Sequence, residues 1–142
     1  MNQLVYNLKF KETMYDIRNH SIKLVLIPAT VSNSFLLYME DEMERVLRED
    51  GEYFFYKDEE MLEAIICQAT EEGETVLTFF DEKLLVFSAC FKLNRNCFKV
   101  EHSYKQYVGT MEALKPFEEG GDIDYSKLVF TEPKRKKGGK KK

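Results

Sequence analysis

Two segments near the start of the chain have the hydrophobic pattern of β-strands. Over residues 4–10 apolar side chains alternate with more polar ones, which is the two-residue period of a strand with one buried face. Residues 22–27, IKLVLI, are richer in aliphatic side chains and end at Pro28, whose ring disfavours continuation of a strand ladder. The polar segment between the two strands is long enough to let them pair antiparallel, although the pattern does not require that pairing.

A different period follows the polar residues 32–34. Apolar residues recur every three or four positions from Phe35 to Leu47, with charged residues between them, and this spacing predicts an amphipathic helix. A serine or asparagine among residues 32–34 can supply the capping oxygen, and Gly51 lies where a left-handed residue would end the helix. The aromatic run at residues 52–56 then predicts a short strand.

The middle of the chain predicts a second helix and then a meander of strands. Asp58 can cap this helix, whose apolar residues again form one stripe. Residues 75–80 and 83–91 are apolar and rich in β-forming side chains, and the polar pair at 81–82 suits a hairpin connection. Residues 97–102 add a third strand to this meander.

The last part of the chain predicts one more helix and one more strand. Residues 104–114 suit a helix that Pro116 stops, and residues 128–130 suit an edge strand. Strands that cluster, rather than alternate strictly with helices, predict an α+β fold with a mostly antiparallel sheet and two to three helices. We expect one compact globular domain over residues 1–130 and a disordered lysine-rich tail over residues 131–142.

Length and composition narrow the class of protein. The chain has 142 residues, of which 44% are apolar, which is enough for one hydrophobic core. No apolar run approaches the roughly 18 residues of a membrane span, and the first residues lack the layout of a signal peptide. Three cysteines are an odd number and argue against a disulfide framework. These features predict a small soluble cytoplasmic protein with no membrane attachment.

The net charge of −4 hides a division of sign. Residues 134–142 hold seven of the 21 basic residues and no acid, which leaves 14 basic and 25 acidic residues, or −11, in the rest of the chain. Clustered lysine and arginine attract polyanions in a salt-dependent way. Further basic residues surround the expected turn at Asn94. The residues assigned to binding nucleic acid or another polyanion are Lys92, Arg95, Lys99, Lys134, Arg135, Lys136, Lys137, Lys140, Lys141 and Lys142.

Acidic residues are densest between Glu40 and Glu63. One interpretation is a solvated helix face, because runs of charge keep a protein surface wet. The other is a docking surface for a basic protein partner, with Glu42 and Glu49 as its candidate contacts.

The chain carries no signature of catalysis or of cofactor binding. The phosphate-binding patterns G-x-x-x-x-G-K and G-x-G-x-x-G are absent, as is the nucleophile turn G-x-S-x-G. Cys90, Cys97 and His102 lack the separations of two to four residues that are typical of a structural zinc site. The sequence therefore assigns no catalytic residue, no metal and no cofactor, and it favours a non-catalytic role.

Three classes of function follow from these observations. The first is a non-catalytic accessory protein whose basic tail contacts nucleic acid or another polyanion while its acidic body engages a protein partner. The second is a protein-interaction module that uses the acidic surface of the first helix, with the tail only aiding solubility. The third is an enzyme whose pocket the sequence does not reveal. The residues leave the partner and the oligomeric state open.

Overall fold

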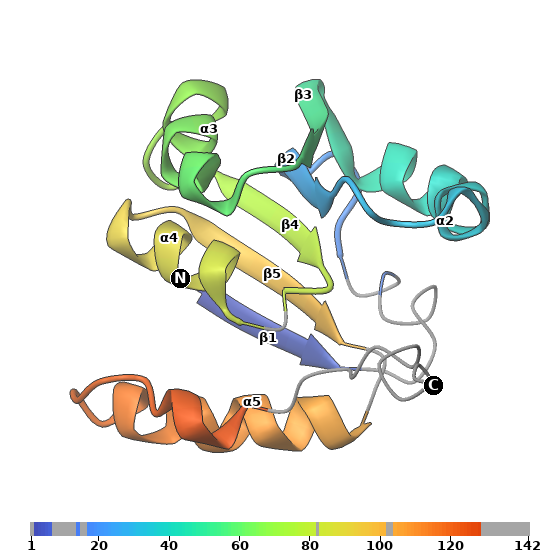
Figure 1. The fold of residues 1–142 in the computed structure, drawn as a ribbon. Helices are drawn as coiled ribbons and strands as arrows, with labels where there is room; N and C mark the ends of the chain where they lie inside the picture. Colours follow the sequence, from blue (N-terminus) through green and yellow to red (C-terminus); the bar gives the residue numbers. More distant parts are fainter. Residues whose placement is uncertain (1, 7–13, 15–16, 82, 102–103, 129–142) are drawn as a thin grey trace.

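The fold is a parallel α/β sheet with helices on both faces (Figure 1). The computed structural model describes residues 2–6, 14, 17–81, 83–101 and 104–128. Five strands are hydrogen-bonded in the order β1-β5-β4-β2-β3, and every described strand pair is parallel. The strands are β1 (Asn2–Tyr6), β2 (Ile22–Pro28), β3 (Leu47–Tyr56), β4 (Thr75–Phe79) and β5 (Asn96–Glu101).

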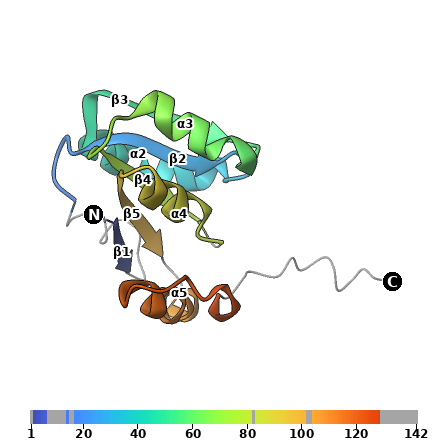
Figure 2. The ribbon, with the colours of Figure 1, turned by 90° about the vertical axis from the view of Figure 1, so that its left-hand side faces the viewer.

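Helices cover both faces of this sheet, and one helix lies near its β1 edge. The α-helices are α2 (Asn33–Val46), α3 (Leu62–Ala69), α4 (Leu85–Lys92) and α5 (Tyr104–Glu118), and two 3-10 turns are η1 (Glu59–Met61) and η2 (Tyr125–Lys127). α2 lies on one face, whereas α3 and α4 lie on the other (Figures 1 and 2). α5 lies near β1, which is an edge strand of the sheet (Figure 1).

The predicted α+β fold with a mostly antiparallel sheet was wrong. Parallel neighbours need a crossover connection between them, whereas the prediction joined strands by hairpins. The main error was at residues 83–91, which were expected to form a strand and lie mostly in α4. Because α4 also carries apolar residues, Leu85 and Phe91, on the side away from its buried face, no polar face reveals its helical period. The described residues hold four α-helices rather than two or three.

Other elements were predicted correctly, because their local signals agree with the fold. β2, β4 and α2 lie where the hydrophobic pattern placed them. The backbone N–H of Phe35 donates to Oγ of Ser32 at 3.1 Å, and that of Glu60 donates to Oδ1 of Asp58 at 2.9 Å. These caps satisfy backbone donors that the first turn of a helix leaves unpaired.

The sheet separates two hydrophobic cores. Leu24 and Leu26 of β2 point into the core that α3 and α4 cover, whereas Val25 and Ile27 point into the core that α2 covers. A strand buried on both faces needs apolar residues at every position rather than at alternate ones. The continuous aliphatic run of β2 is therefore the mark of a central parallel strand.

Gly51 does not end α2, as the sequence suggested, but lies inside β3. The register between β2 and β3 shifts between Ile22 and Leu24, and Gly51 lies in the part of β3 that accommodates the shift. A Cβ atom at position 51 would lie 2.8 Å from Cδ1 of Leu47 and 2.9 Å from the carbonyl oxygen of Lys23. This close approach of two backbones requires glycine.

We expect Gly51→Ala to lower the free energy of unfolding by about 1–3 kcal/mol, because the Lys23 carbonyl cannot retreat without disturbing the β2–β3 pair. Urea denaturation measures this loss. The control is Glu52→Ala at the adjacent exposed position, which should stay within about 0.5 kcal/mol of the parent. Equal stabilities of Gly51→Ala and the parent would contradict the close approach.

Two predictions about the carboxyl-terminal part of the chain remain predictions. The expected edge strand at residues 128–130, apart from Leu128, and the expected tail at residues 131–142 lie outside the described residues. Among the helices that the structure describes, none has both the length and the apolar character needed to cross a bilayer.

Candidate functional site

The carboxyl ends of β2 and β4 mark the point where the sheet reverses its strand order. These two strands are neighbours. From β2 the chain runs through α2 to β3 on one side, whereas from β4 it runs through α4 to β5 on the other side. In open parallel sheets, ligands bind in the crevice outside the strand ends at such a switch point. This place is therefore the candidate functional site.

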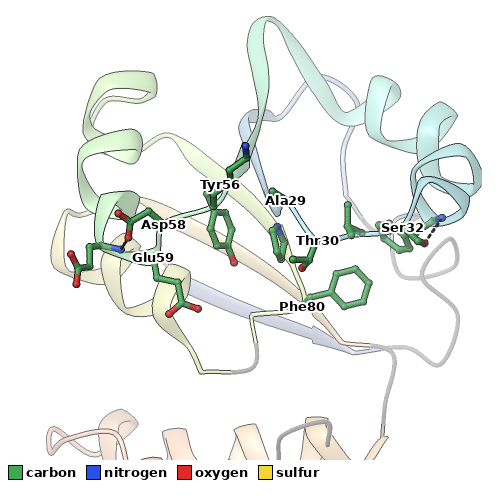
Figure 3. Close-up of a pocket in the computed structure, with 12 residues that line it drawn as sticks. Ala29, Thr30, Ser32, Tyr56, Asp58, Glu59 and Phe80 are labelled. Atoms are coloured by element: carbon green, nitrogen blue, oxygen red, sulfur yellow. Dashed lines mark hydrogen bonds between the residues drawn. The ribbon is translucent and has the colours of Figure 1, made fainter. Parts of the chain in front are cut away.

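A pocket of about 930 Å³ lies at this place (Figure 3). Its walls come from residues 28–32 after β2, residues 56–60 after β3, Phe80 after β4, and Phe35 of α2. The rings of Phe35 and Phe80 pack edge to face with centroids 5.0 Å apart. A second hollow, of about 990 Å³, lies at the amino-terminal start of β3, so it does not share the position that favours ligands in this kind of sheet.

The pocket combines aromatic walls with an acidic rim. Asp58, Glu59 and Glu60 line it together with the cationic side chain of Lys57. Tyr56 is largely buried, and its pKa is raised by burial and then by the charges of Asp81 and Glu59. The phenol therefore stays protonated at neutral pH. These groups suit a cationic or hydrogen-bonding ligand better than an anion.

The turn from β4 to α4 places a carboxylate at the start of the helix. Oδ1 of Asp81 accepts the backbone N–H of Val86 at 3.0 Å, and Oδ2 accepts that of Phe87 at 3.0 Å. Only 3% of Asp81 is exposed. A helix N-terminus beside a switch point is where proteins with parallel sheets hold phosphate or carboxylate groups of ligands. In this chain the carboxylate of Asp81 occupies that position.

The same turn has an unusual backbone. Residues 80–84, FDEKL, contain no glycine, yet Phe80 and Leu84 have φ angles of 62° and 59°. Left-handed conformations at non-glycine residues cost free energy and persist only where the surrounding structure imposes them. Leu84 is fully buried, so packing into the core holds the turn in this shape.

A buried lysine lies near Asp81. Lys99 of β5 is fully buried, and its charge lowers the pKa of Asp81. Burial acts in the opposite direction and prevails, so the pKa of Asp81 is raised above its ordinary value. A buried acidic group at the head of α4 and a buried basic group of β5 thus interact through their charges. A buried charge without a partner would cost far more than this arrangement does.

The buried cysteines add no reactive group to the site. Cys90 and Cys97 are buried and free, and Cys67 is free and exposed. The pKa of Cys97 is raised well above the ordinary thiol value by a hydrogen bond with Cys90 and by burial, so its nucleophilic thiolate is scarce. Among the residues that the structure describes, no group of three metal-ligating side chains comes together. His102 lies outside them.

The basic residues expected around the Asn94 turn do not form one exposed surface. The ammonium of exposed Lys92 donates to Oε2 of Glu63 at 3.3 Å, and Arg95 donates to the backbone oxygen of Thr70 at 2.6 Å. Lys99 is buried and cannot reach a polyanion in this fold. The other assigned basic residues, from 134 to 142, lie outside the described part of the chain.

The two acidic residues assigned to a partner lie on different elements. Glu42 of α2 accepts hydrogen bonds from Nε and Nη2 of Arg45, at 3.1 and 2.9 Å. Arg45 also holds the carbonyl oxygens of Met14 and Ile17, so Glu42 serves the internal structure. Glu49 is exposed and lies in β3 rather than on the first helix.

Comparisons with known proteins bear on the fold. No protein-family model and no curated protein matches the sequence. A crystal structure of M1.HpyAVI, a methyltransferase, is similar, with a TM-score of 0.50 and 15% sequence identity over 79% of this chain and 97% of that chain. The two chains share an arrangement of parallel strands and flanking helices. At this identity the likeness concerns the arrangement of the sheet and helices and not the activity.

Sequence reasoning missed the role of Asp81 at the head of α4, beside the site. Asp81 was interpreted as part of a hairpin turn, although a carboxylate directly after a buried strand is also typical of a βα turn. The distinguishing signal was the segment after it, which forms α4 rather than a strand. Tyr56 and Phe80 were seen as strand aromatics, but nothing in their spacing placed them at one pocket.

The raised pKa of Asp81 predicts a contribution to stability that is lost as the pH rises. The folded state holds the Asp81 proton more tightly than the unfolded state, so this contribution is complete below the ordinary carboxyl pKa and disappears through the raised one. Urea denaturation at a series of pH values should therefore show the parent losing stability relative to Asp81→Asn as the pH increases. A difference that stays constant or reverses would contradict the direction.

Proposed function

We propose that this chain is a non-catalytic binding protein with a methyltransferase-like fold, whose acidic body engages a basic protein partner. The observation that carries the proposal is the carboxylate of Asp81 at the head of α4, bonded to the N–H groups of Val86 and Phe87. Because Asp81 engages these two donors, the head of α4 does not offer them to the anionic end of a cofactor. The fold keeps its scaffold while the usual ligand position is filled.

The remaining surface of the site suits a basic side chain. Asp58, Glu59 and Glu60 line the pocket mouth, and Tyr56 and Phe80 line its walls. Carboxylates attract lysine or arginine, and aromatic faces add cation–π attraction of about 0.5–2 kcal/mol. Charge reversal in Glu59→Lys/Glu60→Lys should weaken binding to poly-lysine, measured by fluorescence anisotropy.

The matched control for that reversal is Glu71→Lys/Glu72→Lys. Both of these residues are exposed and neither lines the pocket, while the change in net charge is the same. Equal weakening by the two pairs would mean that only overall charge matters, and would contradict a role for the pocket.

The proposal also assigns a role to the lysine-rich segment at residues 134–142, which contacts nucleic acid or another polyanion. Its seven positive charges would give a slope of about −6 for log K against log salt concentration on duplex DNA if all of them contacted phosphates. Removal of residues 134–142 should abolish most of the affinity for labelled DNA and RNA in a titration at low salt. Unchanged affinity after this truncation would remove nucleic acid from the proposed function.

A second candidate function is methyl transfer, which the fold and the pocket at the switch point favour. M1.HpyAVI is a methyltransferase, and a pocket of about 930 Å³ is large enough for a small ligand. This candidate requires a methyl donor such as S-adenosylmethionine to bind. Binding of that compound by the intact chain therefore separates the two functions.

A further inference from the structure

The outer edge of β3 is a long strand edge that no described strand covers. β3 is the last strand in the sheet order and has 10 residues. Residues 52–56 pair in continuous register with residues 24–28 of β2, which leaves their other side open to a further strand. Exposed edges in natural proteins are usually blocked by lysine, proline or a bulge. Residues 52–56 carry neither lysine nor proline.

Apolar side chains stand on both sides of this edge. Phe54 and Phe55 are 40% and 45% exposed, and Met61 is 50% exposed. Neighbouring residues of a strand point to opposite faces, so the two rings flank the edge above and below. A groove of about 580 Å³ contains all three side chains together with the buried side chain of Ile65 from α3. An added strand would find apolar contacts on both of its faces.

The charge along the edge selects the kind of strand that fits. Glu49 and Glu52 are exposed, and neither makes an ion pair with a described residue. Asp58 and Lys57 also line the groove, and their charges are of opposite sign. A second copy of the chain would bring another acidic edge, whereas a strand with lysine or arginine would complement it.

We propose that the outer edge of β3 binds an extended basic segment of a partner protein as an added strand. The partner's backbone pairs with residues 52–56, its apolar side chains cover Phe54 and Phe55, and its basic side chains face Glu49 and Glu52. This mode of recognition takes affinity from backbone hydrogen bonds and specificity from alternate side chains. The inference rests on the proposed function, because it adds to the pocket a second surface by which the acidic body engages a basic partner.

The test is a calorimetric titration of the full chain with acetyl-Lys-Val-Lys-Val-Lys-Val-Lys-amide. A second peptide of the same sequence carries N-methyl groups at alternate residues, which remove the backbone donors of one edge and keep the charge. We expect the first peptide to bind, and the methylated one to bind at least about tenfold more weakly, which corresponds to about 1.4 kcal/mol. Equal binding of the two peptides would overturn the added strand.

Variants locate the site. Phe54→Ala/Phe55→Ala and Glu49→Lys/Glu52→Lys should each weaken binding of the unmethylated peptide, whereas Met111→Ala, at an exposed apolar position of α5, should leave it unchanged. Unchanged binding in the Phe54→Ala/Phe55→Ala variant, with far-UV circular dichroism like that of the parent, would overturn the proposal. So would a dimer in light scattering that this variant dissociates, because a second copy would then be the occupant.

Failure of this inference differs from failure of the proposed function. If the parent binds the peptide but the β3 variants and N-methylation have no effect, the acidic body still binds a basic partner at another surface. If the parent binds S-adenosylmethionine, the non-catalytic proposal fails regardless of what the peptide does.

Discussion

Lys99→Met is expected to lower the free energy of unfolding by about 3–5 kcal/mol at pH 7, because it leaves the carboxylate of Asp81 buried without its neighbouring cation. Methionine has nearly the length of lysine, so loss of packing contributes little to this value. Urea denaturation followed by circular dichroism measures the loss. Near pH 4 the loss should be smaller, because Asp81 can then take up a proton and become neutral.

The double variant Lys99→Met/Asp81→Asn provides the control for this prediction. It removes both charges, and we expect it to recover most of the stability that Lys99→Met loses, since the two side chains act as a unit. Additive losses from the two single changes, independent of pH, would show that Lys99 and Asp81 do not interact through charge.

Asp81→Ala is expected to lower the free energy of unfolding by about 2–5 kcal/mol and to create a site for small carboxylates. The change leaves the N–H groups of Val86 and Phe87 without their acceptor and removes a buried carboxyl group that interacts with the charge of Lys99. Formate is small enough for the space that the removed carboxyl vacates. Thermal unfolding of the variant should therefore shift to higher temperature with sodium formate relative to sodium chloride of equal concentration, as ligand binding to the folded state requires.

Asp58→Ala is the matched control. Asp58 also caps a helical turn, through the N–H of Glu60, but it is exposed. We expect this change to cost about 1 kcal/mol and to give no difference between formate and chloride. A formate effect of the same size in the parent, Asp58→Ala and Asp81→Ala would mean that the anion acts on protein surfaces in general and not at the head of α4.

The elements that sequence predicted well are those whose pattern is set locally. The stripe of α2 and its Ser32 cap arise from residues close together in the chain, and so does the aliphatic run of β2. The direction of the strands is not a local property. β1 pairs with β5 across more than ninety intervening positions, with Leu4 opposite Lys99, and no composition or spacing in either segment marks that pairing.

The site escaped sequence reasoning for a related physical reason. Lys99 was assigned to a polyanion because it lies with Lys92 and Arg95 around the Asn94 turn, whereas the fold buries it. Asp81, whose pKa the charge of Lys99 lowers, lies in a distant segment that was expected to be a turn. Likewise Glu42 was assigned to a protein partner, although Arg45 binds it within α2. The charge pattern in the sequence identified the acidic character of the body, but the choice between internal and external partners is made by the fold.

Calorimetric titration of S-adenosylmethionine into the full chain tests the filled ligand position most directly, with ATP as a second ligand. Both compounds carry negatively charged groups of the kind that helix N-termini bind in parallel α/β sheets. We predict no saturable heat from either compound, because the carboxylate of Asp81 already holds the donors of α4. Saturable micromolar binding of S-adenosylmethionine would contradict this prediction and would identify the chain as a cofactor-binding protein.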